Sequence, residues 1–103
     1  MSPTAFKVLT SSQWAELQRD SAFAGAPIDL ADGYIHMSTA SQLEETLAKH
    51  FAGQTGLVIA EIDLSCFGEA LKWEVSRGGA LFPHLYAPLP QSAVIGIQLR
   101  DMA

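Results

Sequence analysis

Residues 73–86 bring together four kinds of side chain that can do chemistry, around two adjacent glycines. They are the carboxylate of Glu74, the guanidinium of Arg77, the imidazole of His84 and the phenol of Tyr86, with Gly78 and Gly79 between them. The chain has only 6 Lys and Arg residues and 3 His residues, so an Arg, a His and an acid in one short run suggest a ligand site. A planar guanidinium suits a carboxylate or a phosphate, and a Gly-Gly turn lets backbone N–H groups approach an anion.

A second polar segment, residues 32–39, contains an imidazole and hydroxyls in a strand-like pattern. Side chains alternate along a strand, so Tyr34, His36 and Ser38 share one face, opposite two apolar residues. That face lines either solvent or a cleft. Histidine titrates in the range that acid–base catalysis needs, which makes His36 and His84 the candidate general acid or base.

Ser38 could act as a nucleophile only with His84 as its base. His36 lies two positions away on the same face of the predicted strand, roughly 6–7 Å along it, which is too far for a direct hydrogen bond. The chain has no G-x-S-x-G motif either.

Each polar feature also has a purely structural explanation. Arg77 could pair with Glu74 or Glu69 on the surface of a turn, and His84 could be a buried histidine that is hydrogen-bonded inside the protein. The three histidines lack the spacing of a zinc site, and the single Cys66 excludes a multi-cysteine site or an intramolecular disulfide. We therefore predict no metal site.

The composition is typical of one globular domain, residues 1–103. Hydrophobic residues make up 49% of the chain and charged residues 17%, which is sufficient for a core and unlike a disordered chain. The net charge of −5 and the lack of a basic stripe argue against binding to a nucleic-acid backbone. No apolar stretch approaches the roughly 20 residues of a membrane span, and no signal-peptide pattern is present, so we expect a cytoplasmic protein.

Periodicity and turn residues predict two main helices and five or six short strands. The helices are expected at 11–20 and about 41–52, and the strands at 6–9, 34–37, 57–62, 71–75, 82–86 and 94–99. Residues 21–33, with two Gly, one Pro and two Asp, are expected to form a loop. Pro83 restricts 82–86 to an edge strand or an extended segment. Helices that come early and strands that come late favour an α+β domain with a mostly antiparallel sheet.

Both polar segments resemble motifs of a small bacterial family catalogued as domain of unknown function 952. That family carries D-G-[FY]-I-H-x-S-T before a helix and, later, [RK]-W-E followed by S-R-G-G-x-[LF]-F-P-H-[LI]-Y. This chain matches the first motif at Asp32, Gly33, Tyr34, Ile35, His36, Ser38 and Thr39, and the later motifs at Trp73, Glu74, Ser76, Arg77, Gly78, Gly79, Phe82, Pro83, His84 and Tyr86. Phe6–Leu9 followed by Trp14 also resembles the family's opening, so the resemblance covers essentially the whole chain.

The resemblance implies a fold and a cofactor. The family's fold is similar to that of the ADP-ribosyltransferases, a split α+β sheet with an NAD-binding cleft, which makes NAD a candidate cofactor. Residues 35–38 are similar to the H-[LV]-S strand of the tRNA 2′-phosphotransferases of that superfamily, whose polar side chains face NAD. The first strand departs from those enzymes, because they have a His or Arg followed by Gly-Thr, and here Lys7-Val8-Leu9-Thr10 keeps only the Thr. No motif marks a catalytic glutamate; Glu74 and Glu61 are candidates, and we prefer Glu74 because it belongs to the polar run.

We predict a domain that binds a small molecule, with an enzyme acting on a nucleotide-like or phosphorylated, anionic ligand as the leading interpretation. The predicted catalytic residues are His36 and His84, as acid or base, and Glu74, which would orient one of them or stabilise positive charge. The predicted ligand-binding residues are Ser38, Thr39, Arg77, Gly78, Gly79 and Tyr86. The alternative is a non-catalytic module that senses a metabolite or binds a protein, which the departure in the first strand favours. The sequence predicts no oligomeric state.

Overall fold

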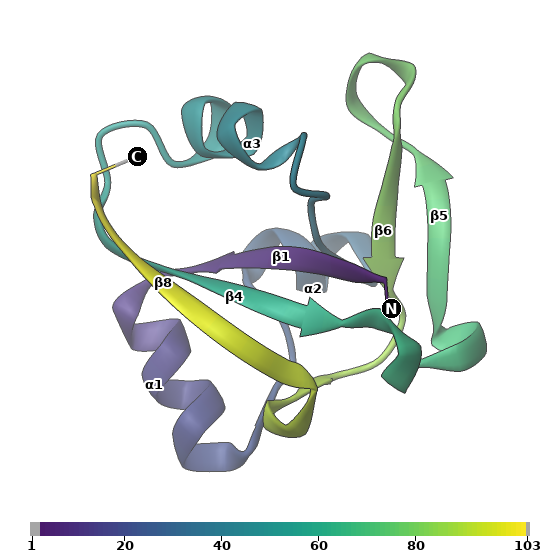
Figure 1. Ribbon diagram of the computed structural model, residues 1–103, viewed down its shortest axis with the longest axis horizontal. Helices are drawn as coiled ribbons and strands as arrows, with labels where there is room; N and C mark the ends of the chain where they lie inside the picture. Colours follow the sequence, from purple (N-terminus) through teal and green to yellow (C-terminus); the bar gives the residue numbers. More distant parts are fainter. Residues whose placement is uncertain (1–2, 103) are drawn as a thin grey trace.

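A three-stranded antiparallel sheet forms the middle of the molecule (Figure 1). Its central strand is β4 (Thr55–Asp63), which pairs with β1 (Thr4–Leu9) along one edge and β8 (Val94–Met102) along the other. The computed structural model describes residues 3–102, without the side chains of Arg77 and Met102.

Strand β4 is covered on both faces, which explains why its sequence is an almost continuous apolar run. Helix α1 (Ser11–Asp20) and helix α3 (Leu43–His50) lie on opposite sides of the sheet (Figure 1). Two clusters of buried side chains alternate along β4 accordingly. One contains Leu17 of α1 with Val58, Ala60 and Ile62, and the other contains Leu43 and Leu47 of α3 with Leu57 and Ile59.

A second antiparallel sheet stands at the end of the first. Its strand order is β3 (Ile35–His36), β6 (Leu81–Leu85), β5 (Leu71–Val75), and the β5–β6 hairpin projects beside the rest of the fold (Figure 1). An isolated bridge joins the two sheets: Phe6 N donates to Ser38 O at 2.7 Å and Ser38 N donates to Phe6 O at 2.9 Å. The split, mostly antiparallel sheet of an α+β domain is thereby confirmed.

The prediction that Pro83 excludes a central strand is wrong, because β6 lies between β3 and β5. Proline has no backbone N–H to donate. In β6 this missing donor lies beyond the end of β3, whose last residue, His36, pairs with His84. The Pro83 carbonyl still accepts from Met37 N at 3.1 Å, so the pairing needs no N–H from Pro83 on that side.

Residues 21–33 are not the loop that the sequence predicts. They contain the short strand β2 (Ala22–Phe23), paired with β7 (Leu89–Pro90), and the helix α2 (Pro27–Asp32). Helix α2 has Pro27 at its first position and ends at Gly33, whose φ of 88° suits glycine. Six residues are too few for a visible apolar stripe, so the signals were confined to the ends of the helix: Pro27 and Asp29 in its first turn and Gly33 after its last residue.

The other elements match the prediction with shifted ends. Residues 11–20 and 71–75 have the predicted bounds, whereas the predicted helix at 41–52 is shorter and the predicted strand at 94–99 is longer. Thr10 caps α1: its hydroxyl accepts from Gln13 N, and the Gln13 side chain accepts from Thr10 N. Short 3₁₀ turns at Leu64–Cys66, Gly68–Ala70, Arg77–Gly79 and Gln91–Ala93 complete the chain.

Leu17→Ala should lower the free energy of unfolding by about 2–5 kcal/mol, because Leu17 is fully buried between α1 and β4. The matched control is Leu30→Ala on α2, where the side chain is 64% exposed and the change should stay within about 0.5 kcal/mol. Urea denaturation followed by circular dichroism measures both. Equal losses in the two variants would contradict the assignment of the core.

Candidate functional site

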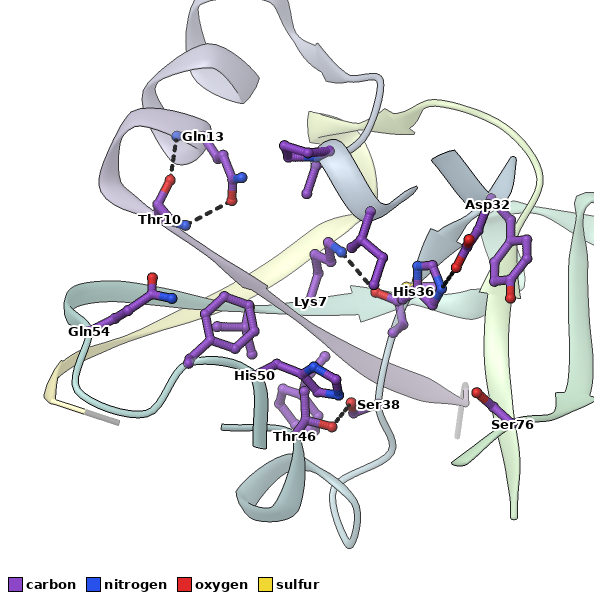
Figure 2. A pocket seen from close by; sticks show the side chains of 18 residues that line it. Lys7, Thr10, Gln13, Asp32, His36, Ser38, Thr46, His50, Gln54 and Ser76 are labelled. Atoms are coloured by element: carbon purple, nitrogen blue, oxygen red, sulfur yellow. Dashed lines mark hydrogen bonds and ion pairs between the residues drawn. The ribbon is translucent and has the colours of Figure 1, made fainter. Parts of the chain in front are cut away.

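A cleft of about 550 Å³ lies where β1, α2, β3 and α3 meet (Figure 2). This volume is in the range of small-molecule sites. Apolar side chains form part of its wall, among them Phe6, Ile28 and Phe51. The polar lining residues are Lys7, Thr10, Gln13, Asp32, Tyr34, His36, Ser38, Thr46, His50, Gln54 and Ser76.

The carboxylate of Asp29 is the hub beneath this cleft, and its side chain is only 1% exposed. Oδ2 accepts from Lys7 Nζ at 2.9 Å and from Ala26 N at 2.8 Å. Oδ1 accepts from His36 N at 3.0 Å and contacts His36 Nδ1 at 2.7 Å. Four bonds therefore satisfy one buried charge, as burial of a charge requires.

Local sequence explains how Asp29 reaches this position. It is the third residue of α2, and its side chain turns back to the free N–H of Ala26, as an acidic residue in a first turn does. The preceding Gly25 has φ 138°, and a Cβ built there would lie 2.9 Å from the Asp29 Cβ. A glycine is thus required for α2 to fold back against its own third residue.

Burial and pairing oppose each other at Asp29 and Lys7. Burial by itself would raise the pKa of the Asp29 carboxyl, but the hydrogen bonds from His36 and the charge of Lys7 outweigh it and lower that pKa to about 2. Burial lowers the pKa of the Lys7 ammonium, and Asp29 partly offsets this by favouring the charged form. Lys7 Nζ also donates to His36 O at 3.0 Å, so the same cation holds the backbone of β3.

His36 connects the hub to the cleft. Its side chain is 25% exposed, and its Nε2 lies 3.0 Å from Asp32 Oδ2 on the side of the cleft (Figure 2). Both ring nitrogens therefore face carboxylate oxygens, and both donate when the ring is protonated. The buried Asp29 fixes the orientation of the ring, whereas Asp32 is 45% exposed and lies where a ligand could replace it.

Ser38 lies in the same cleft, and its hydroxyl partner is Thr46 of α3. The two hydroxyl oxygens are 2.7 Å apart, and Figure 2 shows them on the α3 side, close to His50. No histidine is hydrogen-bonded to Ser38 among the interactions found in residues 3–102. The arrangement offers hydroxyl donors and acceptors to a ligand.

Glu74, His84 and Tyr86 form a second cluster on the β5–β6 hairpin. Glu74 Oε1 lies 2.9 Å from His84 Nδ1 and accepts from the Tyr86 hydroxyl at 2.7 Å. The hydrogen bond from Tyr86, then that from His84, lowers the pKa of the Glu74 carboxyl, and the bond to Glu74 raises the pKa of Tyr86 to about 12. The predicted pairing of Glu74 with a histidine thus has the geometry of an oriented imidazole.

Tyr34 connects the second cluster to the cleft. His36 and His84 are opposite each other on β3 and β6, with ring centroids 5.5 Å apart. The Tyr34 ring stacks on His84 at 4.1 Å and lies 4.5 Å from His36. Tyr34 lines the cleft, while His84 is 2% exposed and is not among the described lining residues.

The remaining predicted site residues are distributed around the rim. Gly78 and Gly79 have φ 67° and 82° and form the turn of the hairpin, next to Ser76, which lines the cleft. Arg77 belongs to the same turn, and its side chain lies outside the described part of the structure. Thr39 is placed before α3, where its N–H donates to Gln42 Oε1 and its hydroxyl contacts Ser41. Thr39 O also accepts from Gln42 N at 3.0 Å, so Thr39 forms the turn that precedes the helix.

Sequence reasoning missed Lys7, Asp29, Thr46 and His50 as residues of this site. A signal existed for Lys7, since it alternates with Ala5 and Leu9 on a face that should be apolar, and a lysine there needs a buried acid. Asp29 carried the complementary signal at the third position after Ala26. Nothing in the sequence showed that these two residues, 22 positions apart, would pair.

Two further kinds of function find no support within residues 3–102. No group of three or more His, Cys, Asp or Glu side chains in this part of the chain is arranged to hold a metal ion. No helix there is long and apolar enough to cross a membrane.

Comparisons with known proteins concern the family and the fold of the chain. The family model described as protein of unknown function (DUF952) matches residues 8–97. The chain belongs to this family. Its fold is similar to the crystal structure of protein CC0527 from Caulobacter crescentus, with a TM-score of 0.91 and 44% identity over 94% of this chain and 85% of that one. The solution NMR structure of CC0527 gives a TM-score of 0.86, also at 44% identity, over 97% and 86% of the two chains. No curated protein matches the chain.

Asp29→Asn should destabilise the DUF952 chain by about 3–5 kcal/mol at neutral pH, because it leaves Lys7 charged and buried without its counter-ion. The folded-state pKa of about 2 lies below the ordinary 3.8, so the carboxylate's contribution is complete above about pH 4 and is lost as the pH falls towards 2. Urea titrations at several pH values should therefore show the gap between the two proteins narrowing over this window, by about 1.4 kcal/mol for each unit of the pKa difference. Asp32→Asn, at an exposed partner of the same histidine, is the control and should cost no more than about 1 kcal/mol. A gap that did not depend on pH would contradict the assignment.

Glu74→Gln should lower the pKa of Tyr86 from about 12 towards its ordinary 10.0, because a neutral acceptor no longer favours the protonated phenol. The chain has only two tyrosines, so a Tyr34→Phe background leaves Tyr86 as the sole phenol to titrate by ultraviolet absorbance. An unchanged titration midpoint would show that Glu74 does not accept from Tyr86 in solution.

Proposed function

We propose that the cleft binds a nucleotide-like or other phosphorylated small molecule and that His36 exchanges a proton with it. The observation that carries this proposal is the setting of His36, with one ring nitrogen fixed by the buried Asp29 and the other at the cleft. An imidazole held in this way by a carboxylate is the usual arrangement of a catalytic acid or base.

The proposed step is a proton transfer from Nε2. A ligand oxygen takes the place of the exposed Asp32 carboxylate and receives the hydrogen bond that Nε2 donates. The proton then moves to that oxygen as its bond to the neighbouring phosphorus or carbon atom breaks, while the oxygen of a water molecule or of a second hydroxyl substrate forms the new bond to that atom, and Asp29 keeps the ring in position throughout. The proton that this nucleophile loses is the one that returns to Nε2. His36 thus acts as a general acid, and the same atom takes the proton back when the reaction is completed.

The polarity of the cleft supports a ligand with a ring and an anionic group. Phe6, Ile28 and Phe51 offer apolar contact to a flat ring or a sugar face, and the Ser38–Thr46 pair offers hydroxyls. Ser76 brings the turn of Arg77, Gly78 and Gly79 to the cleft, and we place the anionic group there. His84, Glu74 and Tyr86 act from behind Tyr34 as positioning residues.

The residues of the first strand do not fit NAD as the resemblance would require. Where the ADP-ribosyltransferase-like enzymes have a His or Arg followed by Gly-Thr, this chain has Val8-Leu9-Thr10, and Val8 is a buried apolar residue. The neighbouring cation, Lys7, is already bonded to Asp29 and to the His36 carbonyl. We therefore derive no step through NAD, and NAD enters the test below only as one of the ligands.

A non-catalytic, metabolite-sensing module is the second candidate. It is favoured by the same Lys7–Asp29 pair, because a cation that is already neutralised contributes structure and not chemistry. The two candidates share the cleft and differ in whether His36 is needed for turnover or only for binding.

His36→Gln should lower the turnover rate of the bound ligand by about 10²–10⁴-fold and leave the Kd of the ligand within a few fold of the wild-type value. Thermal-shift and calorimetric binding with inorganic phosphate, mononucleotides, ADP-ribose, NAD and sugar phosphates identifies the ligand class, and NMR of the bound ligand follows its conversion. Arg77→Ala should remove the thermal shift for every ligand that carries phosphate.

Lys49→Ala is the matched control for Arg77→Ala, since Lys49 is an exposed cation paired with Glu45 on α3 and is not a lining residue. Binding that is lost in Arg77→Ala and retained in Lys49→Ala supports the proposed site. Binding without conversion in the wild type supports the sensing module. No thermal shift with any of these ligands overturns the proposal.

A further inference from the structure

The outer edge of β8 is a long strand edge with no strand against it within residues 3–102. β8 pairs with β4 on one side only and spans nine residues, Val94–Met102. Natural sheets protect such edges with charged residues, prolines, short strands or bulges. The middle of β8, residues 95–99, contains neither a charge nor a proline, and the one irregularity of its pairing lies near its start, opposite Glu61–Ile62.

The apolar side chains of this strand are exposed on one face. Ile95 is 56% exposed, Ile97 50% and Leu99 71%, and the three alternate along β8. Ile97 and Leu99 are opposite Ala60 and Val58 of β4 and therefore share the face that is buried against α1, whereas Ile95 lies at the irregularity of the pairing. The apolar layer of the core therefore continues to the open edge and stops there without a cover.

The opposite face of the same edge holds a carboxylate without a counter-ion. Glu61 of β4 is half-buried and is opposite Gly96 of β8. Its Oε1 lies 3.7 Å from the position that a Gly96 Cβ would take, so the carboxylate extends over the glycine towards the edge. Among the hydrogen bonds and ion pairs found in residues 3–102, none engages Glu61.

We propose that β8 pairs with β8 of a second copy of this chain, antiparallel about a two-fold axis at Gln98. This register pairs the strand with itself, Val94 with Met102, Ile95 with Asp101 and Ile97 with Leu99, and keeps both copies of each residue on the same face of the sheet. Two three-stranded sheets become one of six strands. The Ile97 and Leu99 side chains of both copies then form one apolar cluster across the axis.

The same register supplies the missing counter-ion. It places Arg100 of the second copy opposite Gly96, two strands away from Glu61, or about 10 Å between the Cα atoms. Extended Arg and Glu side chains span that distance because Gly96, between them, has no side chain. In the single chain Arg100 is bonded to Glu44 at 2.9 Å, but Glu44 is 72% exposed and such a pair is weak. Exchange of Glu44 for Glu61 therefore costs little.

Sedimentation equilibrium of the wild-type chain tests the proposal directly. We expect a monomer–dimer equilibrium with a Kd in the micromolar range or below, and a chain that stays monomeric up to roughly 1 mM overturns it. Ile97→Lys should raise the Kd at least tenfold, because it places two charges in the apolar cluster on the axis. Leu99→Lys is the second variant should Ile97→Lys fail to fold, and a dimer with an unchanged Kd in the folded variant overturns the proposal.

A charge exchange tests the register. Glu61→Arg and Arg100→Glu should each raise the Kd, and the double variant should bring it back to within a few fold of the wild type. Glu44→Gln is the matched control, since it removes the ion pair within the chain and should leave the Kd unchanged. Thermal unfolding of each variant confirms that it is folded. Failure of the double variant to restore dimerisation overturns this register.

Discussion

The buried carboxylate of Asp29 is the constraint on which the other parts of the site depend. It binds a side-chain donor from β1 and backbone donors from the start of α2 and from β3, so that one side chain joins three elements. A carboxylate that is 1% exposed needs all its hydrogen bonds within the protein, because water cannot reach it to replace a bond that is lost. The positions of Lys7, Ala26 and His36 are therefore fixed relative to one another. Replacement of such a network by apolar residues is often neutral for stability, which makes a role in positioning His36 the better explanation of its presence.

The cleft follows from this anchoring. Helix α2 is folded back under β1 by Asp29, and α3 packs on the other face of the sheet through Leu43 and Leu47, so the space between them stays open. His36 is held at its wall by a partner that cannot move and contacts a second partner, Asp32, that is exposed to solvent. A fixed side and an exchangeable side are what a proton-transferring group requires. The second imidazole, His84, also has a ring nitrogen against a carboxylate, that of Glu74, but it lies behind the Tyr34 ring.

The central sheet, in contrast to the site around Asp29, buries almost no charged groups. Residues 57–62 of its middle strand are apolar except for Glu61, and the two helices cover the faces of the sheet over β1 and β4 but not as far as β8. A second sheet placed beside the first would cover the exposed apolar side chains of β8 and would also bring a counter-ion to the Glu61 carboxylate. The site and the edge are on different parts of the fold, so ligand binding and self-association can be studied separately.

The α+β class, the strands at 71–75 and near 57–62, the helix at 11–20 and the polar character of both motifs could be predicted from local sequence. These follow from periodicity, turn residues and local hydrogen bonding, which act over a few residues. The sequence also singled out His36 and Ser38, because alternation placed them on one polar face. It did not reveal α2, which is too short to show an apolar stripe, nor the central place of β6, since the missing donor of Pro83 falls beyond the end of β3. The packing of distant segments determines that Lys7 meets Asp29, that Asp29 and not Glu74 orients His36, and that His84 is covered by Tyr34. Those pairings join residues far apart in the chain, and their free energy comes from burial, which no local pattern records.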